Sequence, residues 1–280
     1  MKALNQHISE KLILNKSSKN YNRKYFIPKN KNELDEYINK KKKEAPNNGN
    51  HYGTKENPVD LSYIDFSELL DYLDNQREDI SYLFDEDTEL IYVNASNWIF
   101  KPHVTCGFDH IFCDSALQYI NVTNWQFNDK LRSIGGLFYN CDDLSEIEGI
   151  NTWNTENIEI FGHMFLGCSH LSELNINNWN LSKANSLRGM FVNCKSLKTL
   201  DLSGWDVHNV RRFARLFKGC SELKSINGID NWNVNSGLSF DEMFEDCEKL
   251  NININNWKIN KIATISGAFN NLKNKPKWLK

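Results

Sequence analysis

Apolar and polar residues recur along most of this chain in a unit of about 26 residues, seen most clearly between Cys194 and Phe217. Within this unit Leu200 and Leu202 are two positions apart, which is the spacing of a short β-strand with one buried face. From Val210 onward apolar residues follow at every third position, which is typical of a turn or of one face of a helix. A unit this short cannot bury its own apolar side chains, so we expect it to stack on copies of itself.

Tryptophan, cysteine and phenylalanine mark the copies of this unit. Tryptophan recurs at intervals of 25 to 28 residues, at Trp98, Trp125, Trp153, Trp179, Trp205, Trp232 and Trp257. Cysteine recurs in a constant phase to it, at Cys113, Cys141, Cys168, Cys194, Cys220 and Cys247, and the last five of these have a phenylalanine three residues earlier. This recurrence predicts an α/β solenoid of short parallel strands and short helices or turns, in which each coil buries one indole ring.

The repeat pattern divides the chain into a basic N-terminal part, a cap, a repeat body and a short C-terminal cover. The end coils of a solenoid need covers, because their apolar faces would otherwise meet water. The predicted segments are a flexible tail or short docking helix at residues 1–22, a basic strand–helix segment with a linker at 23–58, an N-terminal cap at 59–82, the repeat solenoid at 83–272 and a C-terminal cover at 273–280.

Two helices are predicted ahead of the repeats. Asn30 or Asn32 can cap a helix that runs to about residue 44, and residues 68–80 form a second helix with inward leucines. Inside the repeat body, Gly149 and Gly228 mark two matching one-residue expansions, each ahead of a tryptophan. We expect local irregularities of the coil at both places.

Charge is distributed unevenly between the two ends of the chain. The net charge is −3, but residues 1–58 carry +7 and residues 59–280 carry −10. A basic arm on an acidic body indicates a separate anchoring role for the arm. Nucleic acids require cationic grooves, so no nucleic-acid partner is expected for the repeat body.

The sequence shows neither an export signal nor a membrane span. Its apolar runs fall short of the ~18–20 residues that a transmembrane helix needs, and polar residues interrupt the N-terminal stretch. Six of the seven cysteines recur with the repeat, which favours reduced thiols. We therefore expect an intracellular protein, or one associated with an assembly or a virion.

One cluster of metal-ligand residues lies in the irregular stretch HVTCGFDHIFC. His103, Cys106, His110 and Cys113 offer two imidazoles and two thiols, which are ligands that zinc prefers. Against zinc binding, the spacing matches no standard zinc finger, and the repeat already accounts for Cys113. The sequence otherwise lacks the motifs of hydrolases, metalloproteases and phosphate-binding enzymes, so we expect a protein without enzymatic activity or cofactor and keep zinc as the alternative.

The block LDLSGWDVHNV and the flanking MF-x-x-C-x-x-L resemble the repeat of the BspA-like leucine-rich-repeat surface proteins of bacteria. NLSKANSLRGMFVNC and NTENIEIFGHMFLGC match the second half of that repeat, and the resemblance covers about residues 83–272. It implies a curved α/β leucine-rich-repeat solenoid, non-enzymatic, used for adhesion or protein binding, and it adds the cell surface as a location. The N-terminal LNQHISEKLIL and YFIPKNKNELDEYI resemble leaders of gut-bacterial and phage-encoded repeat proteins.

Polar positions on the strands and the following turns are the candidate binding residues, because the core takes up the inward positions. They are Glu173, Asn175, Asn177, Lys198, Asp201, Ser203, His208, Asn209, Lys224, Ser225 and Asn227. Such side chains can bind a protein or a carbohydrate, or can simply solvate the surface. We expect a binding or adhesion module with the basic arm as anchor; the alternative is a structural component of a phage particle or an intracellular assembly.

Overall fold

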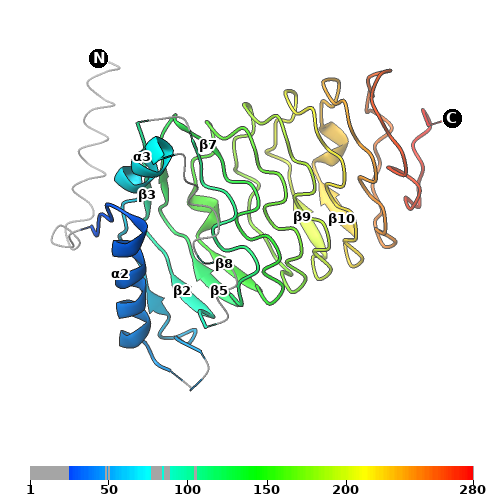
Figure 1. Cartoon of the computed structure of the whole chain (residues 1–280). Helices are drawn as coiled ribbons and strands as arrows, with labels where there is room; N and C mark the ends of the chain where they lie inside the picture. Colours follow the sequence, from blue (N-terminus) through cyan, green and yellow to red (C-terminus); the bar gives the residue numbers. More distant parts are fainter. Residues whose placement is uncertain are drawn as a thin grey trace, which may run out of the picture.

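The computed structural model describes residues 25–47, 49, 51–76, 84, 89–103 and 106–279. They form the predicted parallel β-solenoid, whose coils follow one another along a single axis (Figure 1). The predicted tail at residues 1–22 lies outside the described residues.

The strands of successive coils lie side by side and in register. Tyr92, at the start of one strand, pairs with Tyr119 of the next coil, which in turn pairs with Glu146, all in parallel. The sheet contains, in spatial order, β1 (Val59–Asp60), β2 (Tyr92–Asn94), β5 (Tyr119–Asn121) and β8 (Glu146–Glu148), and it resumes further along the axis with β9 (Thr199–Asp201) and β10 (Ser225–Asn227).

Two further ladders join the first coils. One pairs β3 (Ile99–Phe100) with β6 (Gln126–Phe127), and the other pairs β4 (Cys106–Gly107) with β7 (Leu131–Ser133). From β7 onward, single parallel bridges continue the second of these ladders. In each coil the bridging residue lies about midway in sequence between the strand position of that coil and that of the next coil. We call this series the bridge ladder; it consists of Ser133, Ile160, Ser186, Arg212, Ser239 and Thr264.

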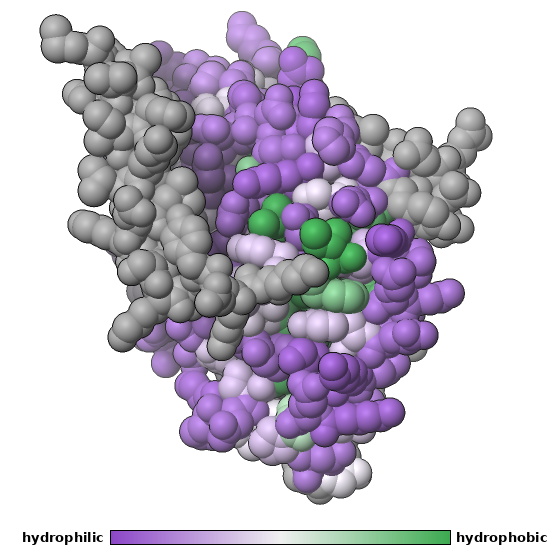
Figure 2. All heavy atoms as spheres, turned by 90° about the vertical axis from the view of Figure 1, so that its left-hand side faces the viewer, coloured by the Kyte–Doolittle hydropathy of each residue, from purple (hydrophilic) through white to green (hydrophobic). Residues whose placement is uncertain are grey.

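Helices occur mainly at the N-terminal end of the solenoid, where α2 (Lys31–Glu44) and α3 (Ser67–Gln76) cover the first coil (Figure 1). Asn30 caps α2 by accepting a hydrogen bond from the N–H of Glu33 at 3.0 Å, so Asn30 and not Asn32 begins this helix. Leu34 and Ile38 of α2 are buried, which gives the helix one apolar face against the first coil. Viewed from this end, the described surface is mostly hydrophilic, with a few hydrophobic side chains near its centre (Figure 2).

The stretch predicted to be a linker packs against the solenoid. Tyr52 forms a parallel bridge with Leu90, and its N–H donates to the carbonyl of Glu89 at 2.8 Å. Phe26, nearer the N-terminus, bridges Ile64 in the same way. Residues 25–58 are therefore held to the body by backbone hydrogen bonds as well as by the apolar face of α2.

Within the coils the predicted short helices or turns are mostly turns. The exceptions in the described repeats are two 3₁₀ helices, η1 (Ile150–Thr152) and η2 (Ile229–Asn231). Each follows one of the two glycines that mark the expansions, and both glycines have positive φ, 79° at Gly149 and 82° at Gly228. A side chain at Gly149 would also collide with Thr123 of the preceding coil, so a glycine is needed there.

The tryptophans form the buried column that the repeat predicted. All seven side chains are at most 5% exposed. Neighbouring rings stack with centroids 4.8 to 5.8 Å apart from Trp98 to Trp179, and 6.2 Å apart from Trp205 to Trp257. Six indole N–H groups donate to a backbone carbonyl of the preceding coil, whereas Nε1 of Trp232 is buried without a partner among the described residues.

Phenylalanine forms a second, continuous column beside the first. Successive rings stack nearly parallel with centroids 4.9 to 5.9 Å apart. Its members are Phe84, Phe112, Phe138, Phe165, Phe191, Phe217 and Phe244. Because each ring contacts the ring of the coil before and after it, the two columns bind neighbouring coils together.

The cysteines form a third column, and here the prediction needs one correction. Phe112 stacks on Phe138, and its N–H donates to the next coil as that of Phe138 does, so the two occupy equivalent positions. The residue three positions after Phe112 is Ser115, whose hydroxyl lies 3.4 Å from the thiol of Cys141. Ser115 therefore takes the first place in the column, and assigning Cys113 to it was wrong. Cys113 lies two residues ahead of the column position, a shift that counting between cysteines does not reveal.

The last coil is covered by the end of the described chain. Trp278 donates from Nε1 to the carbonyl of Ile254 at 2.9 Å and packs edge-on against Phe269. Ile265, which occupies an inward position of the repeat, is nevertheless 37% exposed. It belongs to the last coil of the described residues, among which no later coil covers it. None of the helices in the described part of the chain is both long and apolar enough to cross a membrane.

Candidate functional site

A groove of about 640 Å³ lies on the strand side of the solenoid, where the sheet is interrupted. The coil between β8 and β9 contributes no strand there, so the groove runs over residues 172–177 from one piece of sheet to the other. We call it the strand groove; it is lined by Ser145, Glu146, Ile147, Ser172, Glu173, Leu174, Asn175, Asn177, Thr199 and Asp201.

Carboxylates from three successive coils give the strand groove its charge. They belong to Glu146, Glu173 and Asp201. Hydrogen bonds from the hydroxyl and N–H of Ser203 and from the side chain of Asn177 hold the pKa of Asp201 below its usual range, so it stays ionised at neutral pH. Glu173 is exposed and has no ion pair within the described part of the chain.

One end of the strand groove already holds a cation from the same chain. Nζ of Lys55 lies 2.6 Å from a carboxylate oxygen of Glu146 and 6.0 Å from the ring centroid of Tyr119. The hydroxyl of Tyr119 donates to Glu148, and burial together with this carboxylate raises the pKa of the phenol. An ammonium group is thus recognised by a carboxylate and an aromatic face.

The sequence-derived candidates divide between two surfaces. Four of them, Glu173, Asn175, Asn177 and Asp201, line the strand groove. The others on this side are exposed or half-buried and lie beyond it, at Lys198, Ser203, Lys224, Ser225 and Asn227. The structure places the remaining two, His208 and Asn209, on the turn that leads to the bridge ladder, where the imidazole of His208 contacts Asp206 at 2.8 Å.

A second groove, of about 690 Å³, lies over the bridge ladder. We call it the bridge groove; it is lined by Ile160, Asn185, Asn209, Arg211, Arg212, Leu238 and Ser239. Of these only Asn209 was a candidate from the sequence. One signal in the sequence could have revealed the others. Arg211 and Arg212 are two adjacent charged residues at the repeat positions that Glu159 and Ile160 occupy in an earlier coil, and these positions are partly exposed.

The residues proposed as zinc ligands have other contacts in the structure. The imidazole of His103 lies 2.7 Å from Asp71 of α3, and the thiol of Cys113 donates to Asp114 at 2.9 Å. The ring of His110 lies against Tyr139 at a centroid distance of 5.8 Å. The side chain of Cys106 lies outside the described residues, so zinc binding at these four residues stays a prediction.

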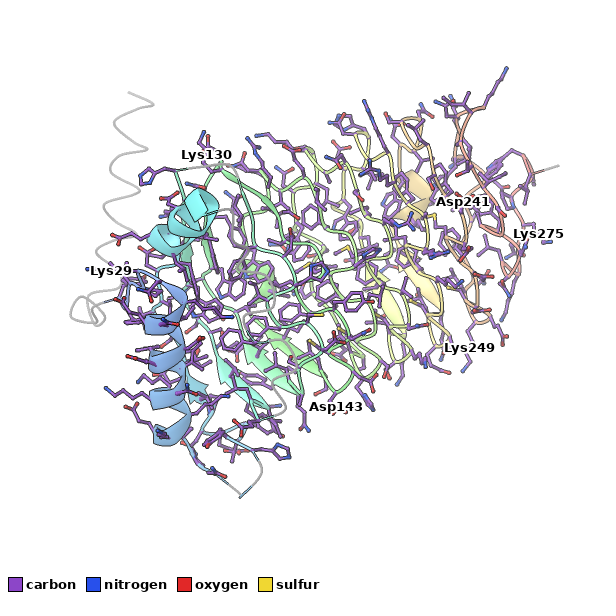
Figure 3. The ribbon with its side chains drawn as sticks, in the orientation of Figure 1. Lys29, Lys130, Asp143, Asp241, Lys249 and Lys275 are labelled. Atoms are coloured by element: carbon purple, nitrogen blue, oxygen red, sulfur yellow. The ribbon has the colours of Figure 1, made fainter. Side chains whose placement is uncertain are left out.

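Another group of possible metal ligands in the described chain lies on the surface. Asp142, Asp143 and His170 bring their ligand atoms within 4.8 Å of one another, and all three side chains are exposed. Asp143 lies at the same edge of the solenoid as Lys249 (Figure 3). Exposed acidic groups of this kind are ordinary features of a protein surface, and we assign no ion to them.

The thiols of the cysteine column are unsuited to nucleophilic chemistry. Burial raises the pKa of Cys141 to about 12, and it also raises the pKa values of Cys168, Cys194 and Cys220. Each column thiol from Cys141 onward donates to a phenylalanine carbonyl of the preceding coil at 2.9 to 3.1 Å. Neutral, hydrogen-bonded thiols stabilise the stack and are not reactive at neutral pH.

A protein family and a solved structure are similar to this chain. A family model described as "Mycoplasma protein of unknown function, DUF285" matches residues 106–225 and 185–278. A crystal structure of a leucine-rich repeat protein from Eubacterium ventriosum ATCC 27560 is similar at 16% sequence identity and a TM-score of 0.25, covering 71% of this chain and 70% of that one. No curated protein matches the sequence.

Proposed function

The chain belongs to the family described as Mycoplasma protein of unknown function, DUF285, and we propose that it acts as a non-enzymatic binding module. The ligand in this proposal is an extended, basic segment of a partner protein, held in the strand groove. Solenoids of short repeats offer long continuous surfaces for such partners.

The contact between Lys55 and Glu146 carries this proposal. It is an intramolecular example of how an ammonium group is bound at one end of the groove. Glu173 and Asp201, on the next two coils, extend the same negative charge along the groove. Successive coils are ~4.8 Å apart, so carboxylates on neighbouring coils are close enough to pair with several cationic side chains of one extended peptide.

The composition of the strand groove favours a protein over a glycan. Its lining is made of carboxylates, amides, hydroxyls and two aliphatic side chains, and contains no aromatic ring on which a sugar could stack. The ring of Tyr119, outside this lining, is buried and lies under Nζ of Lys55. The amides of Asn175 and Asn177 suit the polar groups of a peptide backbone, with the carboxylates selecting its charge.

The basic helix α2 is the anchor in this proposal. Lys41 and Lys42 are partly neutralised by Glu44 and Glu89, at 2.9 and 3.3 Å. Lys40 lies farther from Glu44, at 3.9 Å, and its side chain is 73% exposed. Since residues 25–58 pack on the first coil, deleting them would disturb the fold. Charge reversal at Lys40 therefore tests anchoring better than truncation does. If α2 is the anchor, Lys40→Glu should reduce co-purification of the chain with the assembly or surface to which it is anchored.

Short labelled peptides test the strand groove directly. We expect the full chain to bind a peptide of alternating lysine and serine more tightly than its glutamate counterpart, measured by fluorescence polarisation. Glu173→Lys should weaken this binding about tenfold, whereas Glu156→Lys, an exposed glutamate outside both grooves, should leave it unchanged. Absence of lysine–serine peptide binding, or equal loss of it in both variants, would contradict the proposal.

A further inference from the structure

The bridge groove is a second surface that a strand-side ligand leaves unused. It lies about halfway along each coil from the strands, and it contains two of the large apolar side chains that the described chain leaves exposed. These are Ile160, 39% exposed, and Leu238, 38% exposed. Apolar side chains exposed on both sides of one groove are typical of a surface that a partner covers.

Alternation of small and large residues gives the bridge groove its shape. Along the bridge ladder, serine follows every larger residue, so that Ser186 separates Ile160 from Arg212 and Ser239 follows Arg212. Ser186 is buried, whereas Ile160 and Arg212 are exposed and stand above it. The groove spans three coil steps from Ile160 to Ser239, which is roughly 14 Å at the usual spacing of strands.

Two adjacent arginines give the bridge groove a charge opposite to that of the repeat body. Arg211 and Arg212 are exposed, and neither has an ion pair within the described part of the chain. The repeat part of the sequence, residues 59–280, carries a net charge of −10. Two guanidinium groups without partners therefore form a local cationic site on an acidic body.

Two carboxylates that accept hydrogen bonds from residues of the bridge groove are already engaged. Glu159 lies 3.5 Å from Arg132 and accepts a hydrogen bond from Asn185. Asp241 accepts hydrogen bonds from the hydroxyls of Ser239 and Thr264 and from the N–H of Ser266. These contacts leave the two arginines of the groove available to a ligand.

We propose that the bridge groove binds an extended, acidic segment of a partner protein. Its carboxylates pair with Arg211 and Arg212, and its apolar side chains lie on Ile160 and Leu238. Guanidinium groups bind carboxylates through two parallel hydrogen bonds, and arginine beside aliphatic side chains is common in protein interfaces. The length of the groove fits four to five extended residues at ~3.3 Å each.

The same features argue against a nucleic-acid ligand. Single strands bind through a cationic groove combined with aromatic rings on which bases stack. The bridge groove has two cations and no aromatic side chain in its lining. This proposal rests on the proposed binding function and adds a second partner surface to it.

Binding of labelled peptides to the full chain tests the proposal. A peptide of alternating glutamate and leucine should bind measurably below ~1 mM, and its lysine counterpart should not bind at the bridge groove. Arg211→Glu and Arg212→Glu should each weaken the acidic peptide about tenfold or more. Leu238→Ser should weaken it less, and Arg188→Glu, an exposed arginine outside the groove, should leave it unchanged.

Two controls make the result decisive. Thermal melts of each variant should match the parent protein, because the substituted side chains are exposed. The arginine variants should still bind the lysine–serine peptide of the strand groove, so failure at one groove is distinguishable from failure at the other. Absence of acidic-peptide binding, equal loss in Arg188→Glu, or a preference for a single-stranded RNA oligonucleotide that depends on Arg211 would each overturn the proposal.

Discussion

The thiol of Cys194 donates a hydrogen bond across 3.1 Å to the carbonyl oxygen of Phe165, one coil earlier. Both residues are fully buried. The same carbonyl accepts the N–H of Cys168 at 3.1 Å, so the thiol adds a second hydrogen bond, from the next coil, to a buried backbone acceptor. The same contact in other coils makes the cysteine column a structural element of the stack.

Removing this thiol is expected to destabilise the protein. Cys194→Ala removes one of the two hydrogen bonds to the carbonyl of Phe165 and opens a small cavity, and should lower the free energy of unfolding by about 1–2 kcal/mol in urea titrations. Cys194→Ser keeps a donor at the position, as Ser115 does naturally, and should cost less. A loss below about 0.5 kcal/mol in the alanine variant would show that the contact is unimportant.

Stability should fall at alkaline pH because of the same column. Burial raises the pKa of Cys141 to about 12 from an ordinary value of 9.0. Unfolded thiols therefore lose protons at a lower pH than folded ones, so their contribution is complete below pH ~9 and is lost as pH rises toward 12. Urea titrations from pH 7 to pH 10.5 should show the decline, and Cys141→Ser should reduce it.

In native protein at pH 8 these thiols should resist iodoacetamide.

The tryptophan column allows a matched comparison between two coils. Trp205→Ala should lower the free energy of unfolding by about 3–5 kcal/mol, because it empties a large buried volume. Trp205→Phe keeps a ring but leaves the carbonyl of Ile176 without the donor that lies 2.8 Å from it. Trp232→Phe removes an indole N–H that has no partner among the described residues. We therefore expect the phenylalanine substitution to cost more at Trp205 than at Trp232 in denaturant titrations, and the reverse order would contradict the hydrogen-bond assignment.

Acid should weaken an ion cluster near the C-terminal end of the solenoid. Lys218 lies 2.6 Å from a carboxylate oxygen of Glu242, and the guanidinium of Arg215 contacts both oxygens of the same carboxylate at 3.0 and 3.2 Å. These partners lower the pKa of Glu242 to about 2. Their contribution is present above pH ~4.5 and is lost as pH falls toward 2.

Thermal melts between pH 2 and pH 7 check this dependence. Glu242→Gln should make the melting temperature less sensitive to pH in the acid range, and high salt should reduce the difference between the two proteins because the cluster is near the surface. Glu156→Gln serves as the control, since this exposed glutamate has no ion pair within the described part of the chain. An unchanged acid dependence in the Glu242 variant would contradict the assignment.

Much of the candidate site was visible in the sequence, but its grouping was not. Glu173 and Asp201 were candidates because polar residues at strand positions cannot enter the core. Their membership in one groove depends on the interrupted sheet between β8 and β9, which nothing in the repeat pattern indicated. Ile160 and Leu238 were not candidates, because apolar residues in a repeat are expected to face inward.

The sequence by itself determined the solenoid, its period and its buried columns, because side chains one repeat apart must contact each other in a stack of identical short coils. The tertiary structure alone decided the exact register around Cys113, the packing of residues 25–58 on the first coil, and the two grooves. These features depend on contacts between residues that differ from coil to coil. The residues that every coil shares determine how the coils stack, whereas the residues that differ from coil to coil determine the grooves on the outer surface.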